Sequence, residues 1–582
     1  MTPAEALSRV VAAVEAEGER LRAEFYAPQG PRGSRGSCPL DREIEERLQA
    51  LLQALIPAQF CGEECAVTPG TRAGWVWLVD PHDGTFEYTA GRRGSAISVA
   101  LVCEGRPVMG VVHAPDAPDR GRDTIAWAEG AGPIQRNGVA LQTDLSHAAN
   151  LVWATASSAL RPQTWARAVA PARYVAMPSV AYRLARIAAG DGIATASTHS
   201  VNEYDIAAGI ALIRAAGGVA LDAQGNEIAL EGNSERRVSG CFAGAPQAAR
   251  QLARVDWSAL EAEPRREYRT PLGFPRRDDR GRLARGQAVL LGQVIGDSLG
   301  SRVEGKPAAE IAQLYPGGLR ELGDGGPYHT MTGQPTDDSE MALALARTMV
   351  REKRYVAEKV LDAYRAWLTS RPVDVGMTTE RGLLGLATTE SESNGSLMRC
   401  SPIGIWAAGD PALAARTARD DSTLTHTNAT CLEACAAYCA AIAAGDGGAS
   451  RDEMFEAAAA HAKGPAHEAV KRAAKGVAPA DYFTHAGWVL VALQNAFWCL
   501  QALDFEEGLV QTVARGGDTD TNAAIAGSLL GACHGREKIP ARWILSVLAC
   551  RPITEGGALR PRPMDYWPDD VLEVAEALLL AR

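Results

Sequence analysis

Residues 516–535, GGDTDTNAAIAGSLLGACHG, constrain the fold of this chain more than any other stretch. Asp518, Asp520 and Thr521 follow two glycines and precede a run of small residues, which predicts a turn leading into a closely packed helix. A second acidic turn, TDDSEM at 336–341, precedes apolar residues at helical spacing. One Asp at a helix start is usually an N-cap. Two such turns predict a site for paired metals, and oxygen ligands favour magnesium, calcium or manganese over zinc.

Length and local composition predict two domains. A chain of 582 residues is too long for one core, and 46% hydrophobic with 22% charged residues is ordinary globular composition. Residues 261–285 carry eight arginines and three prolines, which predicts a linker between domains at 1–260 and 286–582. Runs such as WVWLVD precede the linker, and Ala- and Leu-rich helical patterns follow it. We therefore expect an α/β domain followed by an all-α domain.

The net charge and the arrangement of the cysteines indicate which kinds of partner and which cellular compartment to expect. The formal net charge of −11 argues against a broad electropositive surface for DNA or RNA. The first residues lack the basic start and apolar block of a signal peptide, and no apolar run reaches the roughly 18 residues of a membrane span. Cys431, Cys435 and Cys439 lie at helical spacing, which favours a buried packing face over a metal or disulfide set. These features predict a cytoplasmic protein without a membrane partner.

The first domain has its own acidic turn in WVWLVDPHDGTFEY, residues 75–88. The apolar run predicts a strand that delivers two carboxylates, a carbonyl and a hydroxyl into one turn. CGEEC lies upstream and NEYDIAAG downstream. This pattern resembles the inositol monophosphatase superfamily, and within it the 3′(2′),5′-bisphosphate nucleotidases, over about residues 1–245. The resemblance implies a layered α/β sandwich that hydrolyses a phosphate monoester of a nucleotide or sugar.

That resemblance also implies the residues of a phosphatase site with two or three magnesium ions. Asp41 paired with Thr85 would orient the attacking water, and Gly84 and Thr85 would offer backbone amides to the phosphate. The chain departs from the family at Tyr204, where Trp is usual, and has no lysine before Asp41. A phosphatase fold kept only as a scaffold is therefore an alternative. The implied metal ligands are Glu63, Asp80, the carbonyl of His82, Asp83 and Asp205.

Further motifs accompany the two acidic turns of the second domain. They are GQVIGDSLGSRVEGK at 292–306, NGSLMRCSP at 394–402 and LTHTNA at 424–429. Together the five motifs resemble the ADP-ribosylglycohydrolases, the group that includes dinitrogenase reductase-activating glycohydrolase. The resemblance implies a centre of two magnesium ions, with manganese as an alternative. Its ligands would be Thr336, Asp337, Asp338, Asp518, Asp520 and Thr521.

The same resemblance implies a substrate site beside this centre. Asp297 and Glu304 would approach the metals and the ribose, with Glu304 as a candidate acid or base. His426 would stack on the nucleotide or hydrogen-bond to it. The loop residues expected to contact pyrophosphate or ribose are Asn394, Gly395, Ser396, Met398 and Arg399. Separately, glycines at 292, 296 and 300 leave one helix face bare, for a ligand or simply for close packing.

The combined expectation is a bifunctional hydrolase with an ADP-ribosylated protein, or a small ADP-ribosyl conjugate, as one substrate. Hydrolysis would occur at the anomeric carbon of the distal ribose. Arginine, serine and nucleic-acid-terminal linkages all fit, so nucleic acid would enter only as an ADP-ribosylated end. The second substrate would be a phosphomonoester. A different class is the alternative: an ADP-ribose-binding protein whose phosphatase-like domain is an inactive scaffold. The sequence makes no prediction of the oligomeric state.

Overall fold

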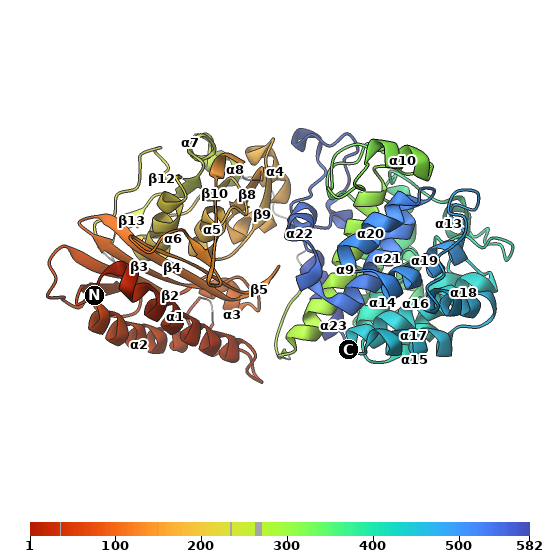
Figure 1. Cartoon of the computed structure of the whole chain (residues 1–582), viewed down its shortest axis with the longest axis horizontal. Coiled ribbons are helices and arrows are strands. Elements are labelled where there is room, and N and C mark those ends of the chain that lie inside the picture. The colour runs from red at the N-terminus through yellow and green to blue at the C-terminus, as the bar shows by residue number, and fades with distance from the viewer. Residues whose placement is uncertain (35, 148, 233–235, 262–269, 277) are drawn as a thin grey trace. The chain divides into compact units, whose positions relative to one another are not determined.

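The computed structural model describes residues 1–582 except 35, 148, 233–235, 262–269 and 277. The chain forms two compact units, Met1–Asp278 and Asp279–Arg582, which Figure 1 shows. The predicted linker at 261–285 lies partly outside the described residues, and helix α9 (Arg280–Gly300) begins within it. No helix of the described segments combines the length and the apolar character that crossing a bilayer requires.

The first unit is built on two β-sheets and a small strand pair. The larger sheet comprises, in spatial order, β1 (Gln59–Gly62), β2 (Trp75–Asp83), β3 (Ala96–Cys103), β4 (Arg106–Ala117), β5 (Gly121–Ala128), β6 (Gln135–Arg136) and β7 (Val139–Ala140). The smaller sheet comprises β12 (Val219–Leu221), β14 (Cys241–Gly244), β10 (Ala194–Ser197), β8 (Leu151–Ala154) and β9 (Arg173–Ala176). The pair consists of β11 (Val201–Asn202) and β13 (Arg237–Val238).

Helices cover both faces of the larger sheet, as Figure 1 shows. One layer, α1 and α2, packs on the outer face, while α5 and α6 lie between the two sheets. β3 is buried almost throughout because both of its faces are covered, which explains its unbroken apolar run. The arrangement confirms the predicted layered α/β sandwich. The helices of this unit are α1 (Pro3–Phe25), α2 (Pro39–Leu55), α3 (Thr85–Thr89), α4 (Pro162–Val169), α5 (Val180–Ala188), α6 (Glu203–Ala215), α7 (Pro246–Ala253) and α8 (Trp257–Glu261).

The second unit contains no β-strand among residues 279–582, all of which are described, and this confirms the predicted all-α domain. After α9 its helices are α10 (Ala308–Leu314), α11 (Asp337–Glu352), α12 (Ala357–Thr369), α13 (Met377–Leu383), α14 (Ser401–Trp406), α15 (Pro411–Thr423), α16 (Ala429–Asp446), α17 (Arg451–His461), α18 (Gly464–Ala474), α19 (Val489–Ala502), α20 (Phe505–Ala514), α21 (Thr519–His534), α22 (Ala541–Leu548) and α23 (Val571–Leu580).

Helices α9 and α21 pack backbone to backbone through the glycine face of α9. A Cβ atom added at Gly292 would lie 2.2 Å from the carbonyl oxygen of Gly527, and one at Gly300 would lie 2.3 Å from that of Thr519. Larger residues would therefore force the two helices apart. Close packing, rather than ligand approach, accounts for these glycines. The crossing brings the end of α9 against the first turn of α21.

The three cysteines of α16 are buried, as the predicted packing face requires. Cys439 donates its thiol to the carbonyl of Cys400 at 3.2 Å, and Cys431 donates to that of Ser393 at 3.4 Å. Neither these two cysteines nor Cys435 forms a disulfide. They therefore pack in the helical core, where burial raises the pKa of the Cys431 thiol to about 12.

Candidate metal centres

In the second unit, Asp297 of α9 organises the start of α11. The backbone amide and the hydroxyl of Thr336 both donate to Oδ1 of Asp297, at 3.0 and 2.9 Å. The amide of Ser339 donates to Oδ2 at 3.1 Å. Asp297 is fully buried, and desolvation raises its pKa to about 6. The structure therefore gives Asp297 the task of fixing the turn that carries Asp337 and Asp338.

The other acidic turn forms a compact carboxylate group. Ligand atoms of Glu304, Asp518 and Asp520 all lie within 4.8 Å of one another. Oε2 of Glu304 accepts a hydrogen bond of 2.8 Å from the amide of Thr519, in the first turn of α21. Since the crossing of α9 and α21 brings their chain ends together, a residue just beyond α9 joins the cluster.

Thr521 links the two acidic turns. Burial raises the pKa of Asp338 and the Thr521 side chain acts to lower it, so the start of α21 lies close to the start of α11. The carboxylates of the two turns also act on one another: burial and neighbouring negative charge raise the pKa of Asp338 and of Asp520 well above the usual range. The two acidic turns therefore lie close enough for their charges to influence one another.

These side chains fit a hard cation. Oδ1 of Asp338 is buried and has no hydrogen-bond partner, which is costly for an isolated carboxylate oxygen and suits a metal ligand. Burial and the Asp518 charge raise the pKa of Glu304 to about 7. Cations placed among these groups would keep all of them ionised at neutral pH.

Two residues that the sequence did not reveal also face this cluster. The hydroxyl of Tyr328 donates to Oδ2 of Asp374 at 2.9 Å. Burial and then the Asp374 charge raise the pKa of Asp337. Burial and the charge of Asp520 likewise raise the pKa of Tyr328 above its usual range. Both residues lie in irregular loops without a repeated spacing, so only the tertiary fold brings them to the site.

The loop predicted to hold pyrophosphate is mostly internal, which corrects that expectation for Gly395, Ser396, Met398 and Arg399. Arg399 is fully buried and pairs with Asp421 at 3.1 Å. The Ser396 hydroxyl accepts from Ser422 at 2.8 Å. A Cβ atom at Gly395 would lie 2.6 Å from Oγ1 of Thr379, and the Met398 carbonyl accepts from Gln293.

Asn394 is the member of that loop that contacts the carboxylate group. Its side-chain amide donates to Oδ2 of Asp518 at 2.7 Å. His426, by contrast, has no exposed surface, and its ring nitrogens contact Ser393 at 2.9 Å and Thr425 at 2.7 Å. Desolvation lowers the pKa of His426 to about 3. A neutral, enclosed ring supports the loop, and this corrects its predicted stacking on a nucleotide.

In the first unit, β2 delivers the predicted carboxylates at its end. The register of β2 against β3 shifts between Asp80 and Asp83, and such an irregularity re-aims side chains next to a site. Gly84 follows with φ of +97°, and a Cβ there would lie 3.2 Å from the side chain of Pro178. The turn therefore requires glycine at the position expected to approach phosphate.

Helix α5 holds Asp83 in place. Oδ2 of Asp83 accepts from the hydroxyl of Ser179 at 2.6 Å and from the amide of Ala181 at 2.8 Å. Burial raises the pKa of Asp83 above its usual range. An anion at a helix N-terminus is stabilised by the unpaired amides of the first turn.

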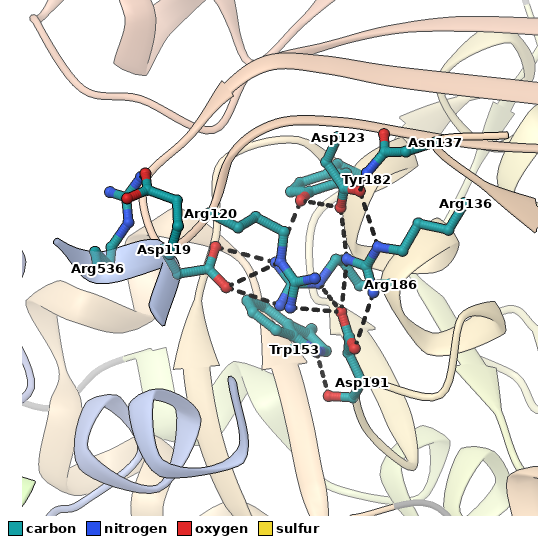
Figure 2. Close-up of polar contacts among 11 residues, drawn as sticks. Asp119, Arg120, Asp123, Arg136, Asn137, Trp153, Tyr182, Arg186, Asp191 and Arg536 are labelled. Atoms are coloured by element: carbon teal, nitrogen blue, oxygen red, sulfur yellow. Dashed lines mark hydrogen bonds and ion pairs between the residues drawn. The ribbon is translucent and has the colours of Figure 1, made fainter. Parts of the chain in front are cut away.

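A buried arginine network fixes α5 itself, and Figure 2 shows its members. Arg186 of α5 is fully buried and pairs with Asp119 at 2.9 Å and also with Asp191. The hydroxyl of Tyr182, also on α5, donates to Asp123 of β5 at 2.6 Å. Because Arg186 and Asp119 are both buried, removing either would leave the charge of the other less well compensated. The network thus locks the helix that supports Asp83.

Glu63 and Asp205 are the remaining predicted metal ligands of the first unit. The amides of Glu63 and Glu64 both donate to Oε2 of the buried Glu45 at 2.9 Å, which folds the CGEEC turn. Burial raises the pKa of Glu63 to about 7, and burial with nearby negative charge raises those of Asp80 and Asp205 well above normal. Mutual repulsion among these neighbouring carboxylates fits a cation-binding role.

The predicted Asp41–Thr85 pair is absent from the described contacts of these two residues, which is a correction. The Thr85 hydroxyl donates to the carbonyl of His82 at 2.6 Å. Asp41 contacts instead the ring of His82, with 2.8 Å between Oδ1 and Nδ1. An imidazole in the turn competes for the carboxylate that was expected to face Thr85.

The chain is a two-domain enzyme of the hydrolase class, with acidic side chains gathered in each domain. Comparison with known proteins gives the families. The profile of the ADP-ribosylglycohydrolase family matches residues 278–579, and that of the inositol monophosphatase family matches residues 37–259. The chain belongs to both families, one in each domain. Both are hydrolase families and generally depend on metals.

Individual relatives agree with this division. An ADP-ribosyl-[dinitrogen reductase] glycohydrolase of Rhodospirillum rubrum is 32% identical over 274 residues, which cover 45% of this chain and 89% of the relative. A probable inositol 1-monophosphatase of Mycobacterium tuberculosis is 32% identical over 212 residues, which cover 33% of this chain and 74% of the relative. A solved structure described as an ADP-ribosylglycohydrolase-related protein complex is 27% identical, with a TM-score of 0.43. The match covers 52% of this chain and 99% of the chain in that structure. The finer likeness to bisphosphate nucleotidases stays a prediction.

Proposed function

We propose that this protein is a bifunctional, magnesium-dependent hydrolase. The C-terminal domain would cleave an N- or O-glycosidic bond to ADP-ribose, and the N-terminal domain would hydrolyse a phosphate monoester of a nucleotide or sugar. The observation that carries the proposal is that each domain gathers its own carboxylates. Ligand atoms of Glu304, Asp518 and Asp520 lie within 4.8 Å of one another, and Asp80 and Asp83 lie together at the end of β2. Such sets are costly unless cations compensate them.

For the C-terminal domain, the compact group of Glu304, Asp518 and Asp520 supports glycoside hydrolysis. Bound magnesium would neutralise these carboxylates and fix the ribose hydroxyls of the substrate. Glu304, with its pKa raised to about 7, is suited to exchange a proton near neutral pH. Asp374, whose charge adds to burial in raising the pKa of Asp337, is a second candidate for that role.

For the N-terminal domain, the end of β2 supports phosphate hydrolysis. Asp80 and Asp83 would hold magnesium together with Glu63 and Asp205, and magnesium there would neutralise the phosphate and acidify a water. The turn at Gly84 leaves backbone amides of the following short helix available to phosphate oxygens. Asp41 contacts His82, which lies between Asp80 and Asp83, and would act on the water from there.

One assay tests both halves. The purified protein is incubated with an ADP-ribosyl-arginine peptide and, separately, with adenosine 3′,5′-bisphosphate and other monoesters including inositol phosphate, with magnesium or with EDTA. We expect magnesium-dependent release of ADP-ribose and of phosphate. ADP-ribose binding without turnover of any conjugate would instead support the binding-protein alternative. Phosphate release that persists in EDTA would contradict the metal assignment of the first domain.

The pairing of the two domains suggests a common substrate chemistry. The glycohydrolase domain would release an ADP-ribose product, and the phosphatase domain would act on an adenosine- or ribose-based monoester. Family membership alone does not establish such a link, because function depends on the site rather than on the fold. The monoester panel tests it: a strong preference for inositol phosphate over every nucleotide would contradict the shared-chemistry hypothesis.

A further inference from the structure

Three buried side chains of the first unit form a continuous hydrogen-bonded chain. Oδ1 of Asp41 lies 2.8 Å from Nδ1 of His82, and Nε2 of His82 lies 3.1 Å from the hydroxyl oxygen of Ser95. Asp41, His82 and Ser95 are 3%, 1% and 5% exposed, respectively. The chain joins the first turn of α2, the end of β2 and the segment just before β3.

The direction of these hydrogen bonds follows from the donors available. An ionised carboxylate can only accept, so Nδ1 of His82 must carry the proton that faces Asp41. In the neutral ring, Nε2 is then an acceptor and takes its hydrogen bond from the Ser95 hydroxyl. One ring is thereby held at both ends. The edge of Tyr88 meets the ring as well, with 4.3 Å between the ring centroids.

The backbone carbonyl and the imidazole of His82 thus have different partners. Its carbonyl accepts from the Thr85 hydroxyl at 2.6 Å and belongs to the predicted metal ligands. Its imidazole reaches instead to Asp41, the carboxylate that the sequence had paired with Thr85. With Thr85 occupied by the carbonyl, the orientation of Asp41 depends on the ring.

We propose that His82 and Ser95 are positioning residues that hold the Asp41 carboxylate toward the attacking water of the N-terminal domain. The inference rests on the proposed phosphatase function. Fixing one carboxylate oxygen through Nδ1 leaves the other oxygen free to accept a proton from water. Ser95 acts on Asp41 indirectly, because its hydroxyl keeps the His82 ring in the tautomer that donates to Asp41.

The arrangement resembles the orienting part of a nucleophile–histidine–carboxylate triad but works in the opposite direction. In such triads the carboxylate orients the imidazole, which then moves the proton. Here the imidazole is enclosed, and the Asp41 carboxylate lies beside the turn of the metal-ligand candidates, because it contacts His82 between Asp80 and Asp83. The group that meets the water is therefore Asp41.

The first test measures the tautomer of His82 and requires no catalytic activity. In the full-length protein labelled with ¹⁵N-histidine, long-range ¹⁵N–¹H correlations report which ring nitrogen is protonated, and the His82→Leu spectrum identifies the His82 signals. We expect the proton on Nδ1, and a shift of population toward Nε2 in Asp41→Asn and in Ser95→Ala. A proton on Nε2 in the unaltered protein, or a tautomer insensitive to both changes, would overturn the proposal.

The second test separates positioning from structural support by steady-state kinetics of phosphate release. His82→Leu keeps the backbone carbonyl and the apolar volume, and we expect kcat to fall on the order of 10²-fold with KM nearly unchanged. His82→Asn, whose side-chain amide can occupy the Nδ1 position, should recover most of that loss. A kcat unaffected by His82→Leu, or a loss that appears only in KM, would contradict a positioning role.

His113→Asn is the matched control, because His113 is equally buried in the same unit but its Nδ1 faces Thr124, at 2.9 Å. We expect it to leave kcat unchanged. In the Asp41→Asn background, His82→Leu should cause almost no further loss, since both changes remove one function. If the kcat loss of the double variant equalled the product of the two single losses, the proposal would be contradicted.

The outcomes of the two tests distinguish this inference from the proposed function. If the unaltered protein releases no phosphate from any monoester while the tautomer responds to Asp41→Asn as expected, the ring does hold Asp41 but the phosphatase assignment fails. If phosphate is released with magnesium while His82→Leu retains full kcat, the phosphatase assignment stands and the positioning inference fails.

Discussion

The side-chain amide of Asn394 donates a 2.7 Å hydrogen bond to Oδ2 of Asp518. The backbone amide of the same residue donates to the carbonyl of Gly487 at 2.9 Å, so Asn394 is held through its backbone as well as through its side chain. One carboxylate oxygen of Asp518 is therefore held in a set direction beside Glu304 and Asp520. A residue that orients a metal ligand changes metal affinity without touching the metal.

Asn394→Ala should weaken magnesium binding by the C-terminal domain. Loss of the orienting amide should raise the magnesium concentration for half-maximal ADP-ribose release roughly 10-fold, with little change in kcat at saturating magnesium. A magnesium titration of turnover measures this. Asn428→Ser is the control, since Asn428 caps α16 by accepting from the amide of Thr430 and serine can do the same. An unchanged titration for Asn394→Ala would contradict the orienting role.

The double change Asp518→Asn with Asp520→Asn should abolish ADP-ribose release. It removes two of the three carboxylates that lie within 4.8 Å, while the helices stay formed because repulsion in the metal-free site is relieved. Chromatographic detection of ADP-ribose and far-UV circular dichroism check the two halves of this prediction. Undiminished turnover would refute the metal assignment, and a change confined to KM would indicate substrate positioning instead.

Asp83→Asn should lower phosphate release on the order of 10³-fold or more, because it removes a direct metal ligand. ADP-ribose release by the same full-length variant should be unaffected. Asp222→Asn is a matched control, since Asp222 lies in a turn of the same unit, where it accepts from the amides of Gln224 and Asn226. Loss of ADP-ribose release in Asp83→Asn would point to a composite active site.

Each unit should retain its own activity when produced separately, with the division at 278/279 rather than at the sequence-predicted edges of the linker. Residues before 279 belong to the first unit: Phe274 packs on Phe25 with 5.3 Å between ring centroids, and the carbonyl of Thr270 accepts from Arg92. We expect phosphate release from fragment 1–278 and ADP-ribose release from fragment 279–582. Two folded but inactive fragments would contradict independent sites.

Metal-free protein should lose stability as the pH rises from about 5 to 7.5. Burial raises the pKa of Glu304 to about 7 and that of Asp297 to about 6, so the folded state binds more protons than the unfolded state in this window. The stabilisation present at low pH is therefore lost as the pH passes through these values. The Glu304 shift, from 4.5 to about 7, alone corresponds to at most about 4 kcal/mol.

Thermal unfolding in EDTA across that pH range measures this loss. Magnesium should raise the Tm more at pH 7.5 than at pH 5, because it compensates the ionised carboxylates. The variant Asp518→Asn with Asp520→Asn should show a shallower decline in EDTA. A Tm in EDTA that rises toward pH 7.5 would contradict the sign of the effect.

Much of the site was predictable because its elements are local. The turns at Asp80 to Thr85, at Thr336 to Asp338 and at Asp518 to Thr521 are short segments in which carboxylates follow a strand or begin a helix. The carboxylates of each turn are only a few residues apart in the chain, so the sequence predicted two acidic centres in two domains. The glycines of α9 likewise showed one bare helix face before its partner was known.

Contacts between distant residues were not predictable in the same way. Asp374 and Tyr328 reach the C-terminal cluster from separate loops. Arg399 and its neighbours point into the interior rather than toward a ligand, because Asp421 supplies a buried partner. No local pattern distinguishes an arginine that binds phosphate from one that neutralises an aspartate in the core.

The sequence by itself determined which side chains each domain offers for cations, since strand ends and helix starts are encoded over a few residues. The tertiary structure alone decided how those side chains are partnered. Asp41 pairs with His82 instead of Thr85 because an imidazole donor lies nearer to it once α2 packs beside β2. Hydrogen bonds are short-ranged and directional, so this choice depends on ångström distances that arise only when the chain is folded.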